Sequence, residues 1–213
     1  MQMVVFAAKD YSPRTKSVYM ATYRTYEEVW AKAFPELDKP SAIFSNDFTR
    51  QDYIVSLMDG DTCAACSFFR EVNIKNPIHR KDSWFKEWPN EIFDKLTNDG
   101  LNSGLIYSYG TVHSDYRKSK RPELKTFLLI GYLSMLQAQQ DQFQLMFGAT
   151  RNSHKVDEAC SSWGSITLKE NISYFNTNAD LVVFTPSSVS SASEKYPALA
   201  FDLFNHRLDL RHQ

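Results

Sequence analysis

Short runs of β-branched and aromatic residues alternate along this chain with longer segments whose apolar residues recur every three to four positions. The first pattern predicts strands and the second predicts amphipathic helices. The predicted strands cover residues 3–8, 53–58, 62–72, 104–112, 143–148, 166–175 and 179–185. The predicted helices lie within residues 13–35, 90–97, 122–136 and 153–162. This order predicts an α/β fold, with a mixed, mostly antiparallel central sheet flanked by helices on both faces.

Turn-forming residues separate several of these segments. Gly60, between Asp59 and Asp61, predicts a tight hairpin turn because glycine accepts a positive φ. Gly110 interrupts the strand at 104–112, which predicts a β-bulge or the close approach of a ligand. The sequence therefore predicts an irregular backbone or a ligand contact within this strand, near Gly110.

The length of 213 residues suits one domain with an appendage better than two independent domains. Residues 1–185 are predicted to form the domain. Residues 186–193 are rich in serine and predict a linker, and the tail that follows, to residue 213, is amphipathic. The tail is expected to pack back on its own domain, with docking to a partner as the alternative.

Charge and composition limit the classes of partner. The formal net charge is −1, from 24 basic and 25 acidic side chains, which argues against nucleic acid as a partner unless a local patch exists. No apolar run approaches the ~20 residues that a membrane span needs, and no cleavable leader is evident. Three cysteines without a dense spacing indicate reduced thiols. We therefore expect a soluble cytoplasmic protein, and a homodimer is compatible with these features.

Two of the cysteines, Cys63 and Cys66, have the C-x-x-C spacing of a redox pair or half a zinc site. They lie inside a predicted strand, where alternation would direct the two thiols to opposite faces. No second pair of suitable residues completes a zinc site, so no metal site is predicted. Both cysteines are interpreted as packing residues.

A basic turn follows the strand at 104–112. Residues 112–117 read V-H-S-D-Y-R, which resembles the strand-end phrase V-x-P-x-[Y/F]-[R/Q] of the GNAT (GCN5-related N-acetyltransferase) superfamily. Ser114 stands where proline is common. The resemblance covers residues 3–185 by element order and implies an acyl-coenzyme A (acyl-CoA) site at this turn.

In that superfamily the phrase continues into a glycine-containing loop whose backbone N–H groups hold the pyrophosphate of acyl-CoA. Here Lys120 and Pro122 replace both glycines. Side-chain cations can substitute, because charge-assisted bonds to phosphate are strong. A solvated basic turn without a ligand is the alternative. The resemblance implies these cofactor-binding residues: Val112, Arg117, Lys118, Ser119, Lys120 and Arg121.

The resemblance also suggests catalytic residues. Gly164 matches a glycine after the superfamily's last helix, and the tyrosine that protonates the leaving thiolate falls on Cys160. Cys160 is therefore a candidate proton donor, with core packing as the alternative. Candidates for the general base are Glu71, on a hairpin strand, His113, at a strand end, and waters held by Tyr107 or Tyr109.

The function implied by the resemblance is acyl-CoA-dependent N-acyl transfer, in which an amine attacks the thioester directly. The acyl donor would be acetyl-CoA or another acyl-CoA, and the acceptor an amine on a small molecule or a protein. The alternative is a non-catalytic binding module that engages a protein or a small anion through the basic turn and an aromatic loop at residues 84–88. A nucleic-acid binder is a third hypothesis, which the net charge weakens.

Overall fold

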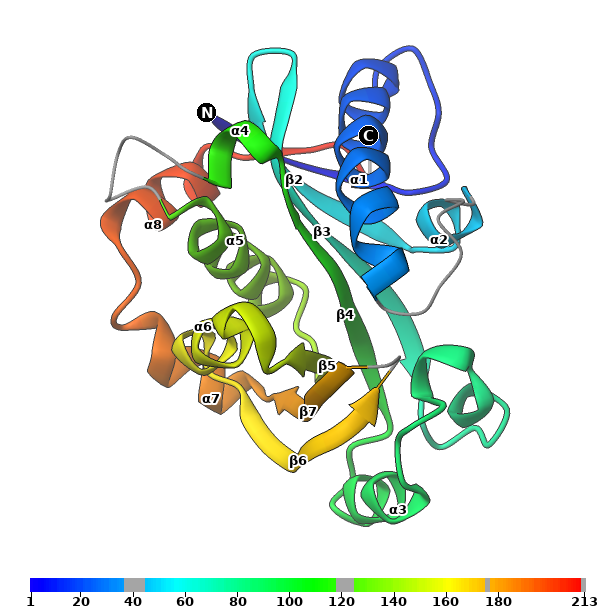
Figure 1. Cartoon of the computed structure of the whole chain (residues 1–213). Helices are drawn as coiled ribbons and strands as arrows, with labels where there is room; N and C mark the ends of the chain where they lie inside the picture. The colour runs from blue at the N-terminus through cyan, green and yellow to red at the C-terminus, as the bar shows by residue number, and fades with distance from the viewer. Residues whose placement is uncertain (37–44, 118–124, 175–176, 212–213) are drawn as a thin grey trace.

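A twisted sheet lies at the centre of the molecule, with helices packed on both faces (Figure 1). The computed structural model describes residues 1–36, 45–117, 125–174 and 177–211. Within those ranges the sheet has eight strands in the order β6-β7-β5-β4-β3-β2-β1-β8. Neighbouring strands are antiparallel except for the pairs β4–β5 and β1–β8. The strands are β1 (Gln2–Ala7), β2 (Tyr53–Asp59), β3 (Thr62–Asn73), β4 (Ser103–Val112), β5 (Met146–Arg151), β6 (Ile166–Tyr174), β7 (Thr177–Phe184) and β8 (Leu208–Asp209).

The helices divide between the two faces of the sheet. Helix α1 lies on one face, and helices α5 to α8 lie on the other (Figure 1). Among the described residues, no helix is long and apolar enough to cross a membrane. The α-helices are α1 (Lys16–Glu36), α2 (Asn46–Thr49), α3 (Asn90–Asn98), α4 (Ser114–Arg117), α5 (Thr126–Gln140), α6 (Val156–Trp163), α7 (Pro186–Ser193) and α8 (Ala198–Asn205), and three 3₁₀ turns are η1 (His79–Lys81), η2 (Ser83–Phe85) and η3 (Ser153–Lys155).

This architecture confirms the predicted fold class. Alternation along each strand sends successive side chains to opposite faces. In β1, for example, Val5 joins the core under α5 to α8, whereas Phe6 joins the core under α1. Helix α5 starts at Thr126, four residues after the predicted position of its start at Pro122, which lies outside the described residues.

The two thiols of the C-x-x-C pair lie on the same face of the sheet, so the prediction of opposite faces was wrong. Cys63 and Cys66 both join the apolar cluster beneath α1 and are fully buried as free thiols. The reason is a β-bulge: Leu57 pairs with Ala65 but Met58 pairs with Cys63, which leaves Ala64 as an extra residue. One inserted residue reverses the alternation. The packing role of both cysteines is confirmed.

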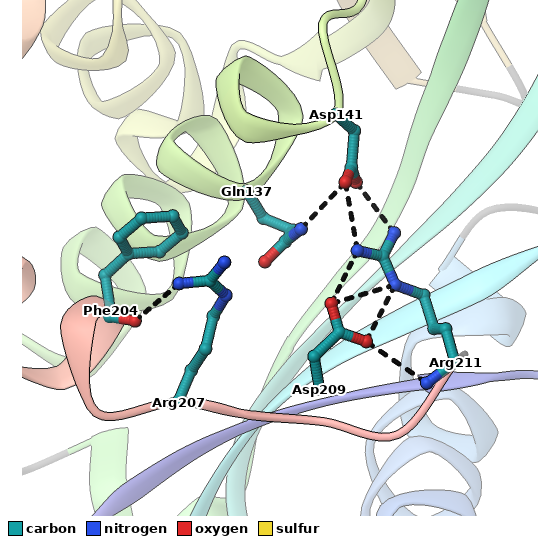
Figure 2. A network of polar contacts seen from close by, with 6 residues as sticks. All are labelled: Gln137, Asp141, Phe204, Arg207, Asp209 and Arg211. Carbon is teal, nitrogen blue, oxygen red and sulfur yellow. Dashed lines mark hydrogen bonds and ion pairs between the residues drawn. The ribbon is translucent and has the colours of Figure 1, made fainter. Parts of the chain in front are cut away.

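The C-terminal segment folds onto the rest of the chain. Residues 186–193, predicted as a linker, instead form α7, which begins with a capping box between Thr185 and Ser188. Val189 and Leu203 are buried in the same core as α5. Strand β8 then pairs with β1, and Arg211 is held by Asp141 and Asp209 (Figure 2). The tail packs back on its own domain, as predicted.

Candidate functional site

The parallel strands β4 and β5 pair only at their beginnings. Leu105 pairs with Met146 and Ile106 with Phe147, and no further pair joins the two strands within the described residues. On its other edge, β5 pairs with β7 along its whole length. Residues 107–112 of β4 therefore run on without β5 as a neighbour. Beyond Ile106, the backbone groups on this edge of β4 therefore form no ladder hydrogen bonds with β5 in the described part of the chain.

A bulge in β4 lies just beyond this point. Cys66 of β3 pairs with Thr111 and Phe68 with Ser108, so two residues lie between the pairs on β4 and one on β3. Tyr109 has a φ of 54°, in the left-handed region. Because of this bulge, the Tyr109 ring packs against the α1 core, although Tyr107, two residues earlier, faces α5. The bulge expected near Gly110 is confirmed.

Side-chain contacts of Trp30 connect α1 to the bulge in β4 and to the end of β5. Trp30 of α1 donates from Nε1 to Thr111 Oγ1 (2.9 Å), and Thr111 Oγ1 donates to the carbonyl of Tyr109 (2.5 Å). The rings of Trp30 and Tyr109 meet edge to face at 5.1 Å. The Arg151 guanidinium, at the end of β5, lies over the Trp30 ring at 5.8 Å. Both diverging strands are thus tied to α1.

The hydroxyl of Tyr109 is a titratable group on the α1 side of the bulge. Burial and the nearby carboxylate of Asp47 together raise the pKa of Tyr109 to about 12. Asp47 is ion-paired with Arg50 at 2.9 Å. The Tyr109 hydroxyl therefore keeps its proton at neutral pH and can donate a hydrogen bond.

Two of the predicted cofactor-binding residues meet at the end of β4. Arg117, the last residue of α4, donates from Nε to the carbonyl of Val112 (3.2 Å). Helix α5 begins close by, because Thr126 Oγ1 donates to the carbonyl of Tyr116 (3.3 Å). Its first turn has no acidic residue and no side-chain cap. These features suit an anion, because unpaired N–H groups and the helix dipole attract negative charge.

The other predicted cofactor-binding residues, Lys118, Ser119, Lys120 and Arg121, lie outside the described residues. Cys160, the predicted proton donor, lies on α6 and is 3% exposed in the core under α5. Burial raises the pKa of its thiol, and the carboxylate of Asp157 adds to the rise. Such a thiol stays protonated but is a weak acid.

The two candidate bases lie at opposite ends of β4. Glu71 pairs with Leu105, at the start of the strand, whereas His113 follows its end. Eight residues of extended chain separate these positions, or ~26 Å. His113 Nε2 lies 3.5 Å from the Glu28 carboxylate, and its Nδ1 accepts from the backbone N–H of Asp115 at 3.3 Å. The structure therefore does not bring Glu71 and His113 together in one site.

Solved structures resemble this arrangement although their sequences do not. No protein-family model matches the chain, and no curated protein matches its sequence. FeeM, an N-acyl amino acid synthase from uncultured soil microbes, aligns with a TM-score of 0.56 at 10% identity over 85% of this chain and 97% of its own. BjaI, a CoA-dependent acyl-homoserine lactone synthase, aligns with a TM-score of 0.57 at 10% identity over 91% of this chain and 88% of its own. Agmatine N-acetyltransferase aligns with a TM-score of 0.53 at 11% identity over 87% of this chain and 100% of its own.

The chain has the GNAT fold. In this GNAT-fold chain, β4 separates from β5 and carries the bulge at Tyr109. The phrase at residues 112–117, which carries the sequence resemblance, begins at the last residue of the same strand. The contacts of Trp30, Thr111 and Arg151 were missed by sequence reasoning. A signal existed in part, since Trp30 lies on a predicted amphipathic helix, but its partners are 81 and 121 residues away along the chain.

Proposed function

We propose that the chain is an acyl-CoA-dependent N-acyltransferase that transfers an acyl group to an amine. The observation that carries the proposal is the separation of β4 from β5 just before the bulge, which leaves the edge of β4 beyond Ile106 without β5 as a hydrogen-bonding neighbour among the described residues. FeeM and BjaI, which share this fold, are acyl-transferring synthases by name, and BjaI was solved with isopentyl-CoA. At 10% identity they support the class of reaction and leave the acceptor open.

The thioester of acyl-CoA would supply the activated carbonyl. Backbone N–H groups on the free edge of β4 would stabilise the oxyanion that forms as the amine nitrogen attacks. Positioning supplies most of the acceleration in such a direct transfer, because the two reactants are held together. The amine loses a proton and the departing sulfur gains one. Tyr109 would orient the amine, or a water that takes its proton, from the α1 side.

Of the predicted catalytic residues, His113 is the base candidate at the same end of β4 as the anion site. Glu71, ~26 Å away along the strand, does not belong to the proposed reaction centre. The burial of Cys160 favours a non-catalytic binding module in one respect. A buried thiol with a raised pKa is a poor replacement for the tyrosine that protonates the leaving thiolate in the GNAT superfamily. A non-catalytic module that binds acyl-CoA without turnover therefore stands as the second candidate.

The basic turn provides the first test. Replacing four of its cations together with alanine is expected to weaken CoA binding at least tenfold, because charge-assisted contacts to the phosphates are lost. Calorimetric titration with CoA at two salt concentrations measures both affinity and its salt dependence. The variant carries substitutions at Arg117, Lys118, Lys120 and Arg121.

A matched control removes four exposed cations elsewhere and is expected to bind CoA like the wild type. An equal loss in both variants would show a non-specific charge effect and would contradict the proposal. Turnover in the wild type, followed as thiol release from acetyl-CoA and longer acyl-CoAs with a panel of amines, then separates the enzyme from the binding module. The control substitutions are at Lys81, Lys86, Lys95 and Lys169.

Tyr109→Phe provides the second test. Removing the hydroxyl keeps the ring contacts with Trp30 and is expected to lower kcat about tenfold, with CoA affinity unchanged. Tyr107→Phe is the control, because that hydroxyl points to the other face and contacts Ser67 (3.3 Å). Equal kcat values for wild type and Tyr109→Phe would exclude the Tyr109 hydroxyl from the reaction.

A further inference from the structure

A cavity of about 750 Å³ lies at the start of β4, the end of the strand away from the proposed acyl-transfer site. Residues from the start of β2, the end of β3, the start of β4 and the segment after α5 line it. Ser103, one of these residues, precedes Tyr109 by six positions, which corresponds to ~20 Å along the strand. This cavity is therefore separate from the proposed acyl-transfer site.

Negative charge dominates the lining of this cavity. Asp52, Glu71 and Asp141 contribute three carboxylates, and Arg211 is the one guanidinium among the described residues that line it. The charge of Arg211 is already engaged, since it bonds both oxygens of Asp141 (2.7 and 2.9 Å) and both oxygens of Asp209 (Figure 2). The described lining therefore offers no second arginine or lysine to pair with the carboxylates of Asp52 and Glu71.

The end of helix α5 adds to the negative character of the cavity. Asp141 is the C-cap of the 15-residue helix α5, whose last turn contains no basic residue, so the negative end of the helix dipole faces the cavity. His79 also lines the cavity, and its Nδ1 accepts a hydrogen bond from the backbone N–H of Asn73 (3.0 Å).

A buried hydroxyl without a hydrogen-bond partner among the described residues belongs to a residue that lines this cavity. Tyr53 is 5% exposed, and its Oη makes no hydrogen bond among the described residues. The ring is fixed on both sides, stacked on Phe69 at 4.7 Å and covered by Arg211 at 4.8 Å. A buried hydroxyl that lacks a partner costs free energy. A polar group of a bound ligand would remove this cost.

The carboxylates lie too far apart to bind one metal ion together, which favours an extended organic cation as the ligand. No group of three or more potential ligand residues is close enough to hold one metal ion in the described part of the chain. The cavity crosses from β1 to β4, which is three strand spacings or ~14 Å. Val72, Leu105 and Phe143 add apolar surface that suits methylene groups. The ~14 Å span from β1 to β4, the separated acceptors and the apolar surface together match a chain of methylenes with charged ends.

We infer that this cavity binds a linear diamine or polyamine as a ligand distinct from the acyl-transfer substrates. One ammonium group would lie between Asp52 and Glu71, and the other end of the ligand would reach the hydroxyl of Tyr53. The inference does not rest on the proposed function, because binding is measured on the protein without acyl-CoA.

Titration calorimetry with three amines tests the inference. Putrescine is expected to bind more tightly than propylamine, because its second ammonium meets a second acceptor, and spermidine more tightly than putrescine, because its longer chain spans more of the ~14 Å from β1 to β4. The double variant Asp52→Asn, Glu71→Gln is expected to bind spermidine at least tenfold more weakly. Tyr53→Phe, which keeps the ring, is expected to weaken binding severalfold.

Glu170→Gln is the matched control, since it removes one exposed carboxylate on β6 and should leave spermidine affinity unchanged. Circular dichroism confirms that each variant is folded. Equal spermidine affinities for the double variant and the wild type would overturn the inference, and so would no detectable binding to the wild type at millimolar spermidine. Displacement of spermidine by an equal concentration of MgCl₂ would overturn it in favour of a metal site.

Discussion

Gly131→Ala is expected to lower the free energy of unfolding by about 3 kcal/mol, at the upper end of the range for overpacked cores. Gly131 lies in the middle of α5, and a Cβ there would be 2.0 Å from Cε2 of Trp163. Trp163 is 1% exposed and packs between α5 and the sheet, with its ring 5.3 Å from that of Phe127. Because the indole is buried and lies directly against this position, α5 and α6 must shift apart to admit the methyl group.

Urea denaturation of wild type and variant measures this loss directly. The double variant Gly131→Ala, Trp163→Leu is expected to be less destabilised than the sum of the two single variants, because the smaller side chain makes room for the methyl group. Alanine is favoured over glycine by about 1 kcal/mol in a helix without such a contact. A stabilised Gly131→Ala protein would therefore show that α5 and α6 do not pack as the structure has them.

Arg211→Met is expected to cost about 2–3 kcal/mol of unfolding free energy, below the range for fully buried pairs because the site is partly exposed. The Arg211 side chain is 11% exposed and joins Asp141 at the end of α5 to Asp209 in β8 (Figure 2). Its removal takes away the guanidinium that joins these two carboxylates. The chain around β8 should then detach from the sheet edge, where Leu210 N donates to the carbonyl of Val5 (2.7 Å).

Two measurements test this second expectation. Urea denaturation gives the total cost, and hydrogen exchange reports whether the Leu210 amide loses protection before the rest of the sheet. Lys32→Met is the control, because its ion pair with Glu28 joins side chains that are 72% and 39% exposed and should contribute less than about 1 kcal/mol. Equal losses for Arg211→Met and Lys32→Met would show that the contacts at Arg211 do not hold the tail.

Local signals in the sequence were sufficient for the order of the elements. The strands near 53–58, 62–72 and 104–112 lie within two residues of their predicted ends, because each run is bounded by turn residues. The irregularity in β4 was also visible, since Gly110 interrupts an otherwise β-branched and aromatic run. Such signals depend on neighbours within a few residues, and a single sequence contains them completely.

Predictions that depended on strict alternation or on composition were less accurate. The bulge at Ala64 places Cys63 and Cys66 together, and no glycine or proline marks it. The serine-rich stretch 186–193 forms α7 because its apolar Val189 is buried in the core, which offsets a composition typical of linkers. In both places, packing against distant segments decided the local structure.

By itself, the sequence determined the class of fold, the hairpin, the interrupted strand and the cationic stretch at 117–121, because short-range periodicity, turn chemistry and charge carry that information. Only the tertiary structure decided which side chains meet. It placed Trp30 and Arg151 together beside the bulge, and it separated Glu71 from His113 along one strand. These relations depend on sheet order and register, which arise when segments far apart in the chain bury their apolar faces against one another.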